Sequence, residues 1–167
     1  VENLSLLSSP FLLIPIAVYA MLKKEKISKM DEKKLLYWFY VAHMKGRYGR
    51  GSSEGLLDSD LTAVNAENLD ELLNNVRLQV KVLSASVDEL KGKGRRSPYF
   101  SLLFFILKQK QIKDWYNGVA ISERLTGRSH ALQFHHIFPK ALIRNQYDHK
   151  EVNEIANLAF INGKTNR

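Results

Sequence analysis

Two short apolar segments near the carboxyl end constrain the fold of this chain more than any other feature. The first starts at Leu132, carries the adjacent histidines His135 and His136, and is closed by Pro139. Because proline cannot continue a paired strand, this pattern predicts a strand that ends by turning both imidazoles into a loop. The second segment, residues 155–161, predicts another short strand.

The spacing of the polar residues around these strands resembles that of the HNH (His-Me finger, ββα-metal) endonucleases. Asn157 follows His136 by 21 residues and Asn166 follows Asn157 by nine, which leaves room for a strand, a loop and a helix start. The resemblance implies that His136 is the general base that activates water, and that Asn157 holds the loop at the catalytic site by side-chain hydrogen bonds. It also implies that His135 and Asn166 are the metal ligands.

The sequence departs from the family pattern in two ways. Asn166 stands where many members have histidine, and the sequence stops at Arg167, where the last helix of the motif would begin. One histidine and one asparagine leave several coordination positions to water and phosphate oxygens, which favours Mg²⁺ or Mn²⁺. A histidine ligand also tolerates Zn²⁺ or Ni²⁺. The sequence contains no cysteine, so thiolate metal sites and disulfides are excluded.

The net charge of +8 favours a polyanionic partner, and the HNH resemblance implies that this partner is DNA. The candidate contacts lie in two glycine-rich loops and beside Pro139, where basic and aromatic side chains can approach phosphates and bases. These residues are Arg47, Tyr48, Arg50, Lys91, Lys93, Arg95, Arg96 and Lys140. Ordinary surface connections are the alternative interpretation of both loops. Residues 54–75, with six acidic side chains and no lysine or arginine, predict a solvated acidic face directed away from DNA.

The rest of the chain predicts helices, because cap residues precede apolar residues at helical spacing. The expected helices begin near Ser9, Asp31, Asn68, Ser86 and Ser97. The apolar run 11–22 is too short for a membrane span and contains Pro15, so no membrane partner is expected. We therefore expect a mainly α protein, in which a helical bundle is followed by a small C-terminal ββα-metal (HNH) unit. The expected domains are a helical domain over residues 1–117 and the HNH motif over residues 129–167.

A further resemblance concerns the helical part. Arg47 and Tyr48 ahead of a serine-rich turn, followed by Asp60 and Leu61, are similar to the region that precedes the HNH part of GmrSD-type modification-dependent restriction proteins. This resemblance implies an endonuclease or nickase module of a cytoplasmic phage-defence protein, with the amino-terminal domain of the same longer protein as a partner. Two alternatives remain: an HNH unit that has lost catalysis and only binds DNA, and a helical scaffold whose basic loops dock another domain. The sequence predicts no particular oligomeric state.

Overall fold

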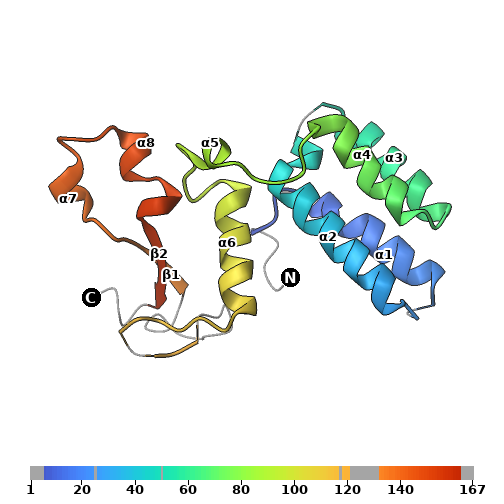
Figure 1. Ribbon diagram of the computed structural model, residues 1–167, viewed down its shortest axis with the longest axis horizontal. Helices are drawn as coiled ribbons and strands as arrows, with labels where there is room; N and C mark the ends of the chain where they lie inside the picture. Colours follow the sequence, from blue (N-terminus) through green and yellow to red (C-terminus); the bar gives the residue numbers. More distant parts are fainter. Residues whose placement is uncertain (1–5, 25, 50, 117, 121–131, 163–167) are drawn as a thin grey trace. The chain divides into compact units, whose positions relative to one another are not determined.

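The chain is mainly helical and has a two-stranded antiparallel sheet near its carboxyl end (Figure 1). The computed structural model describes residues 6–24, 26–49, 51–116, 118–120 and 132–162. Two compact units divide between Ala85 and Ser86, and we call them the helical unit (residues 4–85) and the hairpin unit (residues 86–167). The sequence analysis placed the division between residues 117 and 129, so the hairpin unit begins earlier than expected. None of the helices in the described ranges is both long and apolar enough to cross a bilayer.

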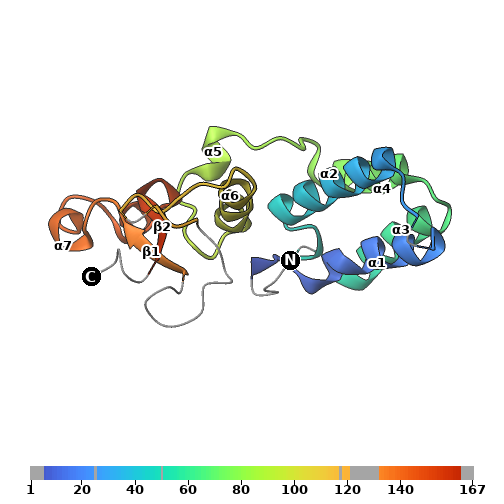
Figure 2. The same cartoon turned by 90° about the horizontal axis from the view of Figure 1, so that it is seen from below.

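The helical unit is a bundle. Its helices are α1 (Leu13–Leu22), α2 (Lys29–Lys45), α3 (Ser53–Asn65) and α4 (Leu69–Val80), with short 3₁₀ helices at Pro10–Leu12 and Arg47–Gly49. Figures 1 and 2 show them side by side, and α1 packs against α3 while α2 packs against α4. The apolar core between them includes Leu12, Trp38, Val64, Leu72 and Val76, all buried. This unit therefore has a core of its own, and burial of each such large apolar side chain stabilises it by roughly 1.5–3 kcal/mol.

Local capping signals set the helix boundaries, and the start of α2 differs from the expected one. The cap is Ser28, whose hydroxyl accepts a hydrogen bond of 3.1 Å from the backbone N–H of Asp31. Asp31 therefore lies in the first turn, where its negative charge interacts favourably with the positive end of the helix dipole. The helix ends at Gly46, whose φ of 63° is a left-handed conformation that glycine adopts without strain.

The acidic segment 54–75 is only partly a solvated face. It forms α3, which the sequence analysis did not anticipate, and Asp60 on that helix is fully buried. The Arg47 guanidinium donates to Asp60 at 2.6 Å through Nε, and the Tyr48 hydroxyl donates to it at 2.6 Å. Only 1% of Arg47 and 6% of Tyr48 is exposed. In this fold an ion pair occupies the Arg47 side chain and a hydrogen bond occupies the Tyr48 hydroxyl, so neither side chain lies at the surface, where the expected contact with DNA would be made.

The hairpin unit combines several short helices with the sheet. Its elements are α5 (Val87–Leu90), α6 (Pro98–Gln109), β1 (Leu132–His136), α7 (Lys140–Ile143), α8 (His149–Val152), a 3₁₀ helix at Ile155–Asn157, and β2 (Leu158–Asn162). The strands pair antiparallel, with Phe134 opposite Phe160 and His136 opposite Leu158. The segment 137–157, which carries α7 and α8, is thus an insert between two paired strands.

An aromatic cluster packs α6 onto the sheet. Phe100 and Phe104 are four residues apart and so lie on the same face of α6. The ring of Phe100 stacks on Phe160 at a centroid distance of 4.5 Å and meets Phe134 edge-on at 5.1 Å. Phe104 lies 5.3 Å from Phe160. Because these contacts bury one face of the sheet against α6, the helix belongs with the hairpin and places its amino end beside the end of β1.

Candidate active site

His136 is the last residue of β1 and points to the side of the sheet that α6 covers. Side chains alternate along a strand, so His136 shares a face with Phe134 and His135 faces the other way. The packing of Phe134 against Phe100 identifies the first of these faces as the one toward α6. The two adjacent imidazoles are therefore directed to different sides of the hairpin.

Asn153 determines which nitrogen of His136 carries the proton. The side-chain oxygen of Asn153 lies 3.2 Å from Nε2 of His136, while its amide nitrogen donates to the carbonyl of His149 at 2.7 Å. Because an amide oxygen can only accept, Nε2 of His136 must be the protonated nitrogen. The lone pair of Nδ1 is then the one available to accept a proton from water.

The surroundings of His136 favour its neutral form. Partial burial lowers the pKa of His136 below its ordinary value; the hydrogen bond with Asn153 opposes this shift, and the charges of Lys140 and His135 add to it. A ring whose pKa is lowered is unprotonated over more of the neutral range, as a general base must be.

Asn157 holds the start of the insert in place. Its side-chain oxygen accepts from the backbone N–H of Phe138 at 2.7 Å, and its amide nitrogen donates to the carbonyls of Phe138 and Val152. The backbone N–H of Ile137 donates to the carbonyl of Asn157 at 2.9 Å. Asn157 is itself buried, so these bonds are sheltered from water. They fix the chain immediately after His136.

A pocket of about 520 Å³ opens beside His136. Residues from the loop before α6, from both strands and from the insert form its walls. They are Gly94, Arg95, Arg96, Ser97, Phe134, His136, Lys140, His149, Asn153 and Leu158. The guanidinium of Arg95 also lies over the ring of Phe134, at 5.9 Å from its centroid. Cationic and imidazole side chains from three segments thus converge on one cavity of the hairpin unit.

Only some of the remaining candidate residues lie at the pocket of His136. Arg95, Arg96 and Lys140 line the pocket, whereas Lys91 and Lys93 are not among the described residues that do. Lys91 instead pairs with Asp88 at 2.7 Å on the surface. Two candidates lie outside the described residues: Arg50 and the proposed metal ligand Asn166. Within the described ranges, no group of three or more histidine, aspartate or glutamate side chains is placed to hold a metal ion.

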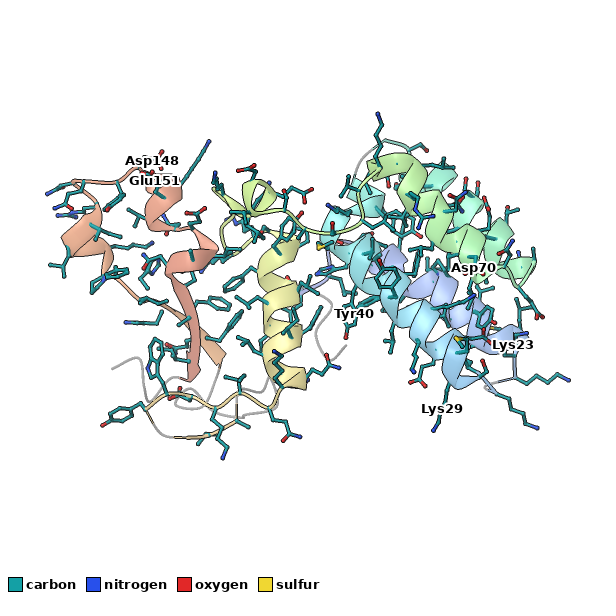
Figure 3. All side chains as sticks on the ribbon, viewed as in Figure 1. Lys23, Lys29, Tyr40, Asp70, Asp148 and Glu151 are labelled. Carbon is teal, nitrogen blue, oxygen red and sulfur yellow. The ribbon has the colours of Figure 1, made fainter. Side chains whose placement is uncertain are left out.

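Three polar pocket residues, Ser97, His149 and Asn153, are not among the site residues that the sequence analysis proposed, and Ser97 marked only a helix start there. A local signal for His149 was present, because Asp148 and Glu151 form a capping box that places it at the start of α8 (Figure 3). The backbone N–H groups of Glu151 and Lys150 donate to the Asp148 carboxylate, and this lowers the pKa of Asp148. No local signal places Ser97 in the same pocket as His136, because that placement depends on tertiary packing.

Comparisons with known proteins give one distant relative. An uncharacterized protein of Methanocaldococcus jannaschii is 27% identical over 150 residues, which is 86% of this chain and 24% of that protein. The chain thus spans about a quarter of the length of this relative. No family model matches the sequence, and no solved structure matches it.

Proposed function

We propose that this chain is a metal-dependent DNA endonuclease or nickase module of the HNH type. The observation that carries the proposal is the placement of His136: an imidazole, oriented by Asn153, that lines a pocket with three cationic side chains. Hydrolysis of a phosphodiester needs a base that takes a proton from water and positive charge near the phosphate. The pocket offers both within one unit of the fold.

In this proposal Nδ1 of His136 takes the proton of the attacking water. Asn153 keeps the ring in the tautomer that leaves Nδ1 unprotonated, and Asn157 keeps the following backbone in place. Lys140 and the arginines of the preceding loop attract the polyanionic substrate. General bases of this kind contribute typically about 10²–10⁴-fold to a rate.

The proposed metal site pairs His135 with Asn166. An imidazole nitrogen and an amide oxygen suit Mg²⁺ or Mn²⁺ that retains water and phosphate oxygens, and they also accept Zn²⁺ or Ni²⁺. Such an ion, when bound, supplies positive charge to the phosphate and to the departing oxygen. His135 faces away from the aromatic cluster, so the packing of α6 on the sheet leaves it outside the core of the unit.

The biological setting follows from the resemblance to GmrSD-type restriction proteins. We propose that the module acts within a longer phage-defence protein of the cytoplasm, with an amino-terminal domain as its partner. The relative in Methanocaldococcus jannaschii, about four times longer than the region it shares with this chain, is compatible with a module of a larger protein.

The direct test is nicking of supercoiled plasmid with Mg²⁺ or Mn²⁺ present. We expect the wild-type chain to nick, and His136→Ala to lose about 10²–10⁴-fold in rate with nearly unchanged DNA affinity. A variant that nicks as fast as wild type would remove His136 from the role of base. DNA binding without any nicking by the wild type would favour the alternative of a binding module that has lost catalysis.

Loss of a metal ligand should be distinguishable from loss of the base. His135→Ala and Asn166→Ala lower metal affinity, so their nicking rates should recover in part as the Mn²⁺ concentration is raised. His136→Ala should not recover, because it removes a proton acceptor. Titration of Mn²⁺ against rate for the three variants measures this, and equal recovery in all three would contradict the assigned roles.

A further inference from the structure

The fold separates the basic loop 91–96 into two parts with different surroundings. Arg95 and Arg96 line the pocket of His136, together with Ser97 at the start of α6. All four cations are exposed, but Lys91 pairs with Asp88, and neither Lys91 nor Lys93 is among the described residues that line the pocket. Equal involvement of all four cations in binding a phosphate was the simplest expectation from the sequence. The structure favours the two arginines.

This loop is held firmly against the insert. The backbone N–H of Gly92 donates to the Glu154 carboxylate at 2.6 Å, and the N–H of Ile155 donates to the carbonyl of Lys93 at 2.7 Å. A Cβ at position 94 would stand only 3.0 Å from the backbone oxygen of Asn153, so the glycine permits a close approach. These bonds fix the backbone that precedes Arg95 and Arg96 before any ligand binds. Less conformational entropy is then lost when the two arginines bind a ligand.

Ser97 offers a hydrogen-bond donor for which the described residues provide no acceptor. It is the N-cap residue of α6, yet its side chain makes no capping hydrogen bond. Its hydroxyl oxygen is buried and has no hydrogen-bond partner in the described part of the chain. Native proteins rarely leave such a group unsatisfied. Because Ser97 lines the pocket, a rotation of its side chain would turn the hydroxyl toward an oxygen bound there. The twelve-residue helix α6 adds the positive end of its dipole at the same place.

The charge of the pocket selects an anion. Among the described residues that line it, three are lysine or arginine, two are histidine and none is acidic. A second pocket of about 450 Å³ in the same unit has the opposite character, with Glu151 and Glu154 in its wall and no lysine or arginine among its described lining residues. The volume of about 520 Å³ lies in the usual range of ligand sites and exceeds the size of a bare phosphate.

We propose that Arg95, Arg96 and Ser97 form a subsite for one backbone phosphate of a polynucleotide strand, with the attached nucleoside in the rest of the pocket. The three residues are positioning residues: they set the register of the strand relative to His136. The identification of the ligand as a polynucleotide phosphodiester rests on the proposed nuclease function, whereas the recognition of an anion rests on the pocket itself.

Binding of a thymidine dinucleotide with a single phosphodiester tests this subsite. The full chain is titrated by NMR in EDTA, so that no cleavage contributes, and the neutral methylphosphonate analogue and inorganic phosphate serve as comparison ligands. We expect Arg95→Gln with Arg96→Gln to weaken dinucleotide binding about tenfold or more, because charge-assisted hydrogen bonds are lost. The matched variant Lys91→Gln with Lys93→Gln removes the same charge from the same loop and should retain the affinity.

Ser97 provides an uncharged test of the same idea. Ser97→Ala should weaken the dinucleotide about two- to tenfold by loss of one neutral hydrogen bond, and Ser97→Thr should restore it because the hydroxyl is kept. Since the Ser97 side chain does not cap α6, the alanine variant should remain folded, which circular dichroism checks.

Three results would overturn the subsite. The first is an equal loss of dinucleotide affinity in the lysine and arginine variants. The second is binding of the methylphosphonate analogue as tight as that of the dinucleotide. The third is a chain that binds inorganic phosphate but not the dinucleotide, which would indicate a site for free phosphate. The nuclease proposal can fail separately. If the chain binds the dinucleotide through Arg95 and Arg96 but never nicks plasmid, the subsite proposal stands and the nuclease proposal is contradicted. If the chain nicks plasmid but the arginine variant binds the dinucleotide as tightly as wild type, only the subsite proposal is contradicted.

Discussion

At the scale of single residues, the contact between His136 and Asn153 carries most of the functional argument. An asparagine in this place sets the tautomer of the ring without adding charge. The amide of Asn153 is itself oriented by its bond to the carbonyl of His149, so its oxygen cannot readily exchange places with its nitrogen. A carboxylate in the same position would accept from Nε2 equally well but would stabilise the imidazolium form of His136.

This difference predicts a shift in pH dependence. In the wild type the pKa of His136 is below its ordinary value of 6.5, so the rate should fall on the acid side only below that pH, as the ring becomes protonated. Asn153→Asp should raise the pKa of His136 and move the acid limb of the rate profile to higher pH. Asn153→Ala should lower the rate, because the ring is no longer held in one tautomer. Profiles of kcat/KM against pH measure both effects, and an unshifted acid limb in Asn153→Asp would contradict the role of His136.

At the scale of elements, the insert between the strands depends on Asn157 for its attachment to the hairpin. Its side chain makes three hydrogen bonds to backbone groups of Phe138 and Val152, from a position that is 8% exposed. Short helices such as α7 and α8 have little stability of their own, since isolated helices below roughly 12 residues are marginal. The conformation of the insert is therefore maintained by contacts of this kind rather than by helix propensity.

Removal of that side chain should loosen the insert. Asn157→Ala removes the partner of the buried Val152 carbonyl, which costs about 1–3 kcal/mol, and of the part-buried backbone groups of Phe138, which cost less because water reaches them. We expect faster amide hydrogen exchange in β2 and the insert, with unchanged exchange in the helical unit. Asn145→Ala, at an exposed position of the same insert, is the matched control and should have little effect. Equal exchange in the two variants would mean that Asn157 does not hold the insert.

At the scale of the whole molecule, the two units are stabilised by different means. The hairpin unit is built on an aromatic cluster, whereas the helical unit contains a buried ion pair that joins several elements. Arg47 donates to Asp60 on α3 and, at 3.0 and 3.2 Å, to the carbonyl of Asn75 and the side chain of Gln79 on α4. Burial, together with the hydrogen bond to Asp60, raises the pKa of Tyr48, so its hydroxyl remains a donor in this cluster.

This arrangement predicts a large effect of Arg47→Ala on folding. Loss of one partner of a buried pair typically costs about 3–5 kcal/mol, because the other charge is left uncompensated. Urea denaturation followed through the buried Trp38 in the helical unit measures the loss, and Arg77→Ala at an exposed position of α4 is the control. The nicking rate per folded molecule should stay unchanged. A stable Arg47→Ala variant with weakened DNA binding would instead restore the surface role that the sequence suggested.

Features that depend on neighbouring residues could be predicted from the sequence. The helix starts expected near Ser86 and Ser97 are both present, the first with a capping box of Ser86 and Glu89. Such boundaries arise from contacts within a few residues, as does the left-handed end of α2 at Gly46. The pairing of the two apolar segments, which was expected from the HNH resemblance, is present as well. The sequence analysis expected α2 to begin at Asp31, whereas the structure has Ser28 as its cap. Both residues are good caps, and only the backbone geometry chooses between them.

Tertiary structure alone decided which polar residues face inward and which line the site. The sequence of the loop around Arg47 is that of a surface connection. The Arg47 side chain is buried only because Asp60, 13 positions later, packs against it and accepts its hydrogen bonds. In the same way Gly92 meets Glu154 across 62 positions, and this contact brings Arg95, Arg96 and Ser97 to His136. The physical reason is that charge and hydrogen-bonding capacity are local properties, whereas the burial that determines their use depends on packing between distant segments.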